Sequence, residues 1–483
     1  MIAWTIYLTF IGAVVALLAP KTAARWIALV TTVAAGTLAL AGFFSPHVAS
    51  QPFTTVTRVA WIPALGMEYH LAVDGISLTL LVVTAVTAVS AVLFSWDIDH
   101  RPNEFFFWLL LVVAGSFGVF LAADLFLFFV FYELVIVPKF FLITIWGSTN
   151  KQYGAMKLTL YSFLGGALVF IGILAAYGSA ASFNLQELAV FNYPPRLETW
   201  AFPVLFLGFA ILGGIWPLHT WAPTGHVAAP TAGSMLLAGI VMKLGAYGAL
   251  RVAMNTFPHG LAVWRNWIAI LAVIGIVYAA GVALRQRDLK FVIGYSSVSH
   301  MGFILLGLAT LNSLGVSGAV LQMFSHGIIG ALLFAIAGRM IYPRTHTRDL
   351  DALSQMNLGR ALPFAATAFV IASAASMGIP GFSGFAAEIT ILIGAWRAYP
   401  IAVWITGIGM VLVAAFTLRA LVKSFFSQLN TAADAHEPMA PITLPEKLGT
   451  ALLIFSTVAV GLYPKPLFDR ITPAVEALRF LQR

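Results

Sequence analysis

The chain has 483 residues, of which 60% are hydrophobic and only 9% are charged. Soluble domains carry about 25% charged residues, so this composition excludes an ordinary water-soluble protein. The formal net charge of +8 is explained by basic cytoplasmic loops rather than by nucleic-acid binding. There is no cysteine, which excludes disulfides, iron–sulfur clusters and thiolate metal sites.

Apolar runs of about 18 to 25 residues recur along the chain, the length that spans about 30 Å of hydrocarbon as a helix. Because open sheets cannot satisfy their backbone in lipid, these runs predict an all-α polytopic membrane protein. The first run lacks a basic n-region, so it predicts a first span rather than a signal peptide. We expect about fourteen spans, near residues 2–19, 24–44, 76–95, 105–122, 125–146, 155–177, 201–218, 230–253, 264–284, 291–310, 314–340, 361–397, 400–426 and 447–464.

Two segments between these spans are too polar to cross the membrane. Residues 45–74 are rich in Pro and Thr and predict an extracytoplasmic hairpin or loop, and residues 182–191 predict a short surface helix. Lys and Arg gather in the odd-numbered loops, at roughly fourteen against five in the even-numbered loops. The positive-inside rule therefore predicts cytoplasmic odd loops and extracytoplasmic termini.

Two spans are interrupted by Pro and Gly, the seventh at residues 216–223 and the twelfth at residues 378–384. Such breaks free backbone carbonyls, which survive at membrane depth only against protein or water. Paired breaks are typical of transporters built from inverted repeats, here spans 4–8 and 9–13, although two unrelated kinks are the alternative. The expected domains are the N-terminal helices 1–3 and connecting loop (1–104), the first repeat (105–254), the second repeat (255–426), and helix 14 with the tail (427–483).

Three charged residues lie inside apolar spans. Glu133 is in the middle of span 5, Lys243 is near the centre of span 8, and Glu388 follows the break in span 12. A charge at the bilayer centre costs about 2.5 to 3.5 kcal/mol on insertion scales, so it needs a partner or a function. Groups that switch between protonated and paired states carry protons. The alternatives are a static ion pair for Glu133 or Lys243 and a helix cap for Glu388.

Lys139 is a fourth charged candidate, six residues after Glu133. In a regular helix the two would lie about 9 Å apart along the axis and roughly 240° apart around it, although Pro138 can distort the geometry. Lys139 is either a relocated counter-ion for Glu133 or a lysine that snorkels to the headgroups.

The histidines His219, His226, His300 and His326 lie in or beside spans. Histidine titrates near pH 6.5 and relays protons, so we predict relay roles for His219, His300 and His326. A hydrogen-bonded helix contact is the alternative for each. The histidines lack metal-ligand spacing, so we expect no metal site.

Several motifs carry a family resemblance. DLKFVIGYSSVSHMG (288–302), APTAGS (229–234) and PLHTW (217–221) resemble the antiporter-like subunits of respiratory complex I. RTHTRD (344–349) is similar to the M-type (chain 4) subunits. The resemblance covers nearly the whole chain and implies fourteen spans, inverted repeats and a proton path across the membrane plane. It matches Glu133, Lys243 and Glu388 to the family's charged residues on helices 5, 8 and 12.

The sequence also departs from the family pattern. Leu212 stands where relatives carry a lysine on helix 7, Thr224 where they carry an aspartate, and Ala228 where they carry an acid or amide. Without the helix-7 lysine, the ion pair between helices 5 and 7 is lost. Transport is then either rerouted or weakened.

The resemblance implies a proton-translocating, non-redox membrane-arm subunit of a complex I-type NADH:quinone oxidoreductase in the bacterial inner membrane. Its partners would be lipid and the L-like and N-like antiporter subunits. No cofactor is expected in this chain, because NADH, FMN, iron–sulfur clusters and quinone would be used elsewhere in the complex. The alternatives are a subunit of a multi-subunit Na⁺/H⁺ antiporter, a transport-impaired structural subunit, and a ferredoxin- or hydrogenase-linked complex. The glutamate on helix 12 favours complex I over the antiporter.

Overall fold

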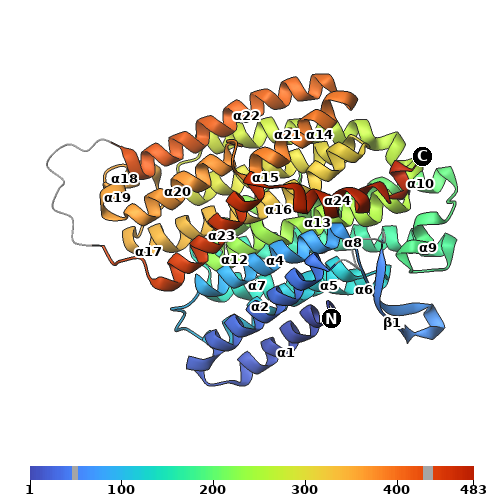
Figure 1. Cartoon of the computed structure of the whole chain (residues 1–483), viewed down its shortest axis with the longest axis horizontal. Helices are drawn as coiled ribbons and strands as arrows, with labels where there is room; N and C mark the ends of the chain where they lie inside the picture. The colour runs from blue at the N-terminus through green and yellow to red at the C-terminus, as the bar shows by residue number, and fades with distance from the viewer. Residues whose placement is uncertain (46–52, 428–438, 483) are drawn as a thin grey trace.

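The computed structural model describes residues 1–45, 53–427 and 439–482. These residues form a bundle of long helices with one small β-hairpin (Figure 1). Within the described ranges, 12 helices are long and apolar enough to cross a membrane, and Trp4–Leu18 and Pro363–Ser376 are shorter apolar helices. The predicted all-α polytopic fold is confirmed. The count of fourteen spans, the inverted repeats and the domain boundaries stay predictions.

The described N-terminal part contains the hairpin and long helices before and after it. Its elements are α1 (Trp4–Leu18), α2 (Lys21–Phe44), β1 (Thr54–Ile62), η1 (Pro63–Leu65), β2 (Met67–Val73) and α4 (Gly75–Leu93). Strands β1 and β2 pair antiparallel, which confirms the hairpin predicted within residues 45–74; residues 46–52 lie outside the described ranges. Asp74 starts α4 because its carboxylate accepts a hydrogen bond of 2.9 Å from the Ser77 amide.

The next group of elements holds the first broken span. It comprises α5 (Pro102–Leu121), α6 (Leu125–Leu134), α7 (Ile136–Trp146), α8 (Lys151–Ala180), α9 (Leu185–Val190), α10 (Pro195–Gly213), α11 (Trp221–Ala228), α12 (Thr231–Leu236), the π-helical η2 (Leu237–Val241), α13 (Met242–Gly248) and the π-helical η3 (Ala249–Met254). Helix α9 confirms the surface helix predicted at residues 182–191.

The remaining elements hold the second broken span. They are α14 (Pro258–Arg285), α15 (Leu289–Ala309), α16 (Ser313–Ala335), η4 (Ile336–Ile341), α17 (Tyr342–Thr345), α18 (Leu350–Leu353), α19 (Leu358–Ala361), α20 (Pro363–Ser376), α21 (Ser383–Ala398), α22 (Pro400–Leu421), η5 (Val422–Phe426), α23 (Leu444–Leu462), α24 (Lys465–Glu476) and η6 (Arg479–Leu481). Helix α24, which the sequence analysis left as a tail, packs against α4 and α16.

Both predicted breaks are confirmed. The chain leaves helical geometry between α10 and α11 and again between α20 and α21. Each break begins at a glycine with a left-handed backbone, Gly214 at φ 69° and Gly378 at φ 69°. Glycine adopts this conformation without a Cβ penalty, which explains why the helices end there.

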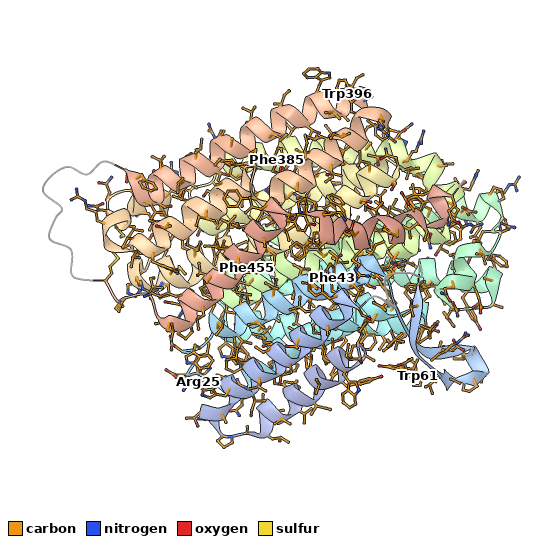
Figure 2. All side chains as sticks on the ribbon, in the orientation of Figure 1. Arg25, Phe43, Trp61, Phe385, Trp396 and Phe455 are labelled. Atoms are coloured by element: carbon orange, nitrogen blue, oxygen red, sulfur yellow. The ribbon has the colours of Figure 1, made fainter. Side chains whose placement is uncertain are left out.

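The bundle has a buried centre and an apolar outer surface. The most apolar stretches of Thr231–Met254 and Ser313–Thr345 are wholly buried. On the outer helices, Phe385, Trp396 and Phe455 are exposed and project from the bundle (Figure 2). An outer surface of large apolar side chains suits lipid, while the buried helices hold the candidate charged residues.

Both described chain ends lie toward the end of the bundle that carries the hairpin (Figure 1). Tyr7 stacks on Tyr69 of β2, with ring centroids 6.4 Å apart. Near the other chain end, Arg479 donates a hydrogen bond of 2.8 Å to the Phe191 carbonyl beside α9. Both described chain ends therefore contact the part of the protein around the hairpin and α9.

A buried ion pair that the sequence analysis missed joins α4 to η3. Arg251 donates to the Asp74 carboxylate, and both side chains are buried. The guanidinium also lies 5.6 Å from the centroid of the Tyr247 ring. The sequence feature that could have indicated this ion pair was an aspartate directly before one apolar span together with an arginine inside the end of another.

Arg251→Met is expected to destabilise the protein by about 3 to 5 kcal/mol, because it leaves the Asp74 carboxylate buried without its cation. Thermal unfolding of the detergent-solubilised protein measures the change. The control is Arg58→Met, since the Arg58–Glu68 pair is solvent-exposed and such pairs contribute about 0 to 1 kcal/mol. Equal unfolding temperatures for the two variants would contradict the expectation.

Candidate functional site

Lys243 lies at the buried centre of the bundle. Its side chain is fully buried on α13, directly after the π-helical segment η2. The Ala238 carbonyl of η2 accepts a hydrogen bond from Lys243 Nζ. Local π-helical geometry is frequent at functional sites, because it shifts backbone groups out of the regular helical pattern.

The second partner of Lys243 is His326 on α16. Lys243 Nζ and His326 Nδ1 are 2.8 Å apart. No carboxylate forms an ion pair with Lys243 among the residues that the structure describes. The described contacts of its ammonium are with a carbonyl and an imidazole, which does not support a static ion pair for this lysine.

His326 leads to a second histidine and a carboxylate. The rings of His326 and His300 have centroids 5.5 Å apart. On α15, His300 Nδ1 lies 3.2 Å from Glu388 Oε1 of α21. The Gln322 amide donates to the same oxygen at 3.3 Å, and His300 Nε2 is 3.3 Å from Ser376 Oγ at the end of α20.

The second break holds Glu388 in place. A Cβ on Gly378 would lie 2.7 Å from Glu388 Oε2, so only glycine allows the backbone to approach the carboxylate this closely. Glu388 lies inside α21 rather than at its first residue, so the helix-cap alternative is wrong.

We name the series Lys243, His326, His300 and Glu388 the central chain. Its four side chains come from four helices and are at most 5% exposed. Ammonium, imidazole and carboxyl groups all gain and lose protons, and each group lies beside the next. Within the described ranges, no group of three or more His, Asp or Glu side chains is arranged to hold a metal ion. The central chain is therefore suited to moving protons.

Glu133 is separate from the central chain. It lies near the end of α6, where a turn at Val135 separates α6 from α7. Its Oε1 atom is buried without a hydrogen-bond partner, and no ion pair involving Glu133 occurs in the described part of the chain. A Cβ on Gly166 of α8 would overlap Oε1, so the carboxylate rests directly on that helix.

His219 is not connected to the other candidates by contacts. It lies in the break between α10 and α11, and neither ring nitrogen has a hydrogen-bond partner among the described residues. Its ring contacts Tyr278 and Tyr295 at centroid distances of 5.6 and 6.0 Å. His226 stacks on Phe334 instead, at 4.3 Å. The relay role of His219 stays a prediction.

Lys139 is buried, with only 3% of its surface exposed, so the snorkelling alternative is wrong. Lys290, within the 288–302 motif, is also buried and donates a hydrogen bond of 3.0 Å to the Ala229 carbonyl. Gln322 and Ser376 of the site were also missed, because neither side chain is charged.

A family model described as NADH:quinone oxidoreductase/Mrp antiporter, TM, matches residues 122–414. The chain belongs to this family. The matched segment contains Glu133, Lys139, His219 and the whole central chain. The candidate site therefore lies within the part of the chain that is matched to this NADH:quinone oxidoreductase/Mrp antiporter family.

Relatives of this family member include chain 4 of NAD(P)H-quinone oxidoreductase from Gloeobacter violaceus, 34% identical over 99% of this chain and 92% of the relative. Subunit M of NADH-quinone oxidoreductase from Rhodobacter capsulatus is 36% identical over 94% of this chain and 90% of the relative. The resemblance to the M-type (chain 4) subunits is confirmed.

Solved structures share the fold of this antiporter family member. Respiratory complex I from Thermus thermophilus has a chain that superposes with a TM-score of 0.91 at 24% identity, covering 100% of both chains. The Mrp complex from Dietzia sp. has one with a TM-score of 0.86 at 22% identity, covering 100% of this chain and 98% of that chain.

Proposed function

We propose that the chain translocates protons as a membrane-arm subunit of a complex I-type NADH:quinone oxidoreductase. The observation that carries this proposal is the central chain, a buried series of proton-exchanging groups across four helices. The M-type relatives support the NADH:quinone oxidoreductase as the parent complex. The glutamate at position 388 favours the same assignment over a cation antiporter.

The central chain would work by successive proton transfers. A proton leaves the Lys243 ammonium for His326, breaking one N–H bond and forming another, and passes through His300 to the Glu388 carboxylate. Redox chemistry in other subunits would drive these steps by changing the charge near the chain, which changes which protonation state is favoured. This chain itself would bind no cofactor, and its role would be translocation without redox catalysis.

The proposed partners are the L-like and N-like antiporter subunits of the membrane arm, together with lipid. The proposed location is the bacterial inner membrane, with both termini on the extracytoplasmic side, as the distribution of basic loops predicts. The apolar outer surface, where Trp396 and Phe455 are exposed, supports contact with lipid or with neighbouring helices (Figure 2).

Affinity purification of the tagged chain from native membranes tests this proposal. We expect co-purified subunits of an NADH:quinone oxidoreductase, and proton uptake into inverted vesicles that depends on NADH and on this chain. Isolation with cation-antiporter subunits, and NADH-driven uptake that survives deletion of the chain, would contradict it.

Gly166→Ala is expected to impair proton uptake in assembled complex, because the new methyl group displaces the Glu133 carboxylate. Alanine is favoured over glycine inside a helix by about 1 kcal/mol, so a loss of uptake would not reflect a weaker helix. The matched control is Gly178→Ala on the same helix, where no atom lies within 4 Å of the new Cβ. Equal uptake by the two variants would contradict the expected displacement.

A further inference from the structure

Lys139 is a buried ammonium without a partner. Its Nζ has no hydrogen-bond acceptor among the described residues, and only 3% of the residue is exposed. Burying an unpaired charge is costly. Lys290, also buried, has the Ala229 carbonyl as its acceptor, and Lys243 has two partners. The missing partner indicates that the Lys139 ammonium is not held in one fixed structural contact.

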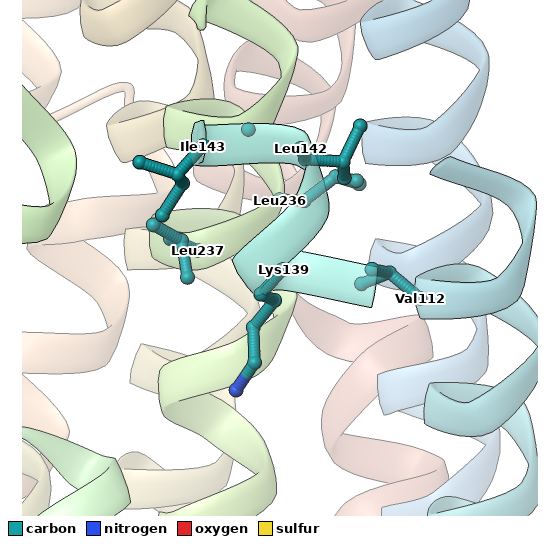
Figure 3. A pocket seen from close by; sticks show the side chains of 7 residues that line it. Val112, Lys139, Leu142, Ile143, Leu236 and Leu237 are labelled. Atoms are coloured by element: carbon teal, nitrogen blue, oxygen red, sulfur yellow. The ribbon is translucent and has the colours of Figure 1, made fainter. Parts of the chain in front are cut away.

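Lys139 lines a small cavity of about 10 Å³. The other lining residues are Val112 of α5, Leu142 and Ile143 of α7, and Gly233, Leu236 and Leu237 of α12 and η2. Figure 3 shows the Lys139 side chain extended away from Leu142 and Ile143. The cavity therefore lies between helices α5 and α7 and the segment that leads directly into Lys243.

Glu133 precedes Lys139 by six residues, which corresponds to about 9 Å along a helix axis. A turn at Val135, whose backbone stays in the right-handed helical region, separates α6, which carries Glu133, from α7, which carries Lys139. The two charges form no ion pair among the described residues. Lys139 therefore follows an unpartnered carboxylate in the chain and lines a cavity that borders the segment leading into Lys243.

Where helix α10 passes near Glu133 and Lys243, at residues 211–213, it provides no alternative proton-carrying group. Its residue Ile211 packs on Gly165, next to the Gly166 that supports Glu133, and Gly213 packs on Gly245, near Lys243. Between these two contacts, Leu212 is buried and apolar. A lysine at position 212 would lie between the same two sites.

We propose that Lys139 carries protons between Glu133 and Lys243, an inference that rests on the proposed function. A proton leaves the protonated Glu133 carboxyl group for the neutral Lys139 amine, so that one O–H bond breaks and one N–H bond forms. The pair changes from two neutral groups to one negative and one positive group. Lys139 then passes the proton toward Lys243 after Lys243 has given its own proton to His326, and Glu133 takes up a new proton.

The test compares Lys139→Met and Lys139→Arg in the assembled complex. Arginine keeps a positive charge but does not release its proton, so it separates a proton carrier from a static counter-ion. We expect both variants to slow NADH-driven proton uptake by about 100-fold or more, the lower edge of what positioned acid–base groups contribute. The matched control is Val137→Met, on the exposed face of the same helix. We also expect the pH profile of uptake to change in both lysine variants and to stay unchanged in Val137→Met.

Rescue gives a second readout. Adding Leu212→Lys to Lys139→Met is expected to restore uptake at least partly, because it returns an ammonium to the space between Glu133 and Lys243. Wild-type uptake in Lys139→Met or in Lys139→Arg would overturn the inference. If Lys139→Met does not assemble, the Arg variant decides alone. Wild-type uptake in Glu133→Ala would instead count against the proposed function, so the two failures are distinguishable.

Discussion

Glu133→Ala is expected to abolish proton pumping while the subunit remains in its complex. The carboxylate has no hydrogen bond at Oε1 and no ion pair among the described residues, so its removal breaks no stabilising contact of that kind. It does remove the carboxyl group that α6 places inside span 5. Proton uptake into inverted vesicles, measured per quinone reduced, gives the result.

The control for Glu133→Ala is Glu68→Ala, which removes a carboxylate from the exposed end of the bundle. We expect normal uptake from that variant. Wild-type proton uptake by an assembled Glu133→Ala complex would show that Glu133 has no part in translocation.

Lys243→Ala and Glu388→Ala are expected to lower coupled quinone reduction by about 10² or more, the range in which positioned acid–base groups contribute. Each change removes one end of the central chain: Lys243 contacts His326 at 2.8 Å, and Glu388 lies 3.2 Å from His300. Electron transfer from NADH to an artificial acceptor should survive, because the proposed function assigns the redox chemistry to other subunits.

Lys423→Ala is the control for this pair, since its ion pair with Asp351 lies at the surface of the bundle. We expect it to leave both activities unchanged. Loss of the artificial-acceptor activity in Lys243→Ala or Glu388→Ala would indicate failed assembly. Normal coupled activity in either variant would remove that residue from the path.

The sequence was sufficient to predict the helical spans and both breaks. Span length follows from the thickness of hydrocarbon, and Pro and Gly mark the breaks locally. Lys243 and Glu388 were identifiable because a charge inside an apolar span is conspicuous. Their connection was not predictable, because α13, α15, α16 and α21 meet only through tertiary packing. His326 could be named as a relay, but not as the group in contact with Lys243.

Lys139 shows a second limit of reasoning from sequence. The sequence could not show whether its ammonium is buried or reaches the membrane surface, because this depends on the helices packed around it. Lys290 shows the same limit near a span boundary, because its burial depends on contacts with a distant segment that contains Ala229. The Asp74–Arg251 pair joins residues from distant parts of the chain, and no local pattern relates them.

The contact between Lys243 and His326 limits the stoichiometry of transport. Two nitrogen atoms 2.8 Å apart share a hydrogen bond only if one donates and the other accepts. The pair therefore holds a single excess positive charge, because two cations at this distance would have no acceptor between them. A second proton enters only after the first has moved on to His300. The Lys243–His326 pair therefore alternates between holding one excess proton and holding none. The number of protons that the central chain delivers per catalytic cycle equals the number of times this pair is emptied.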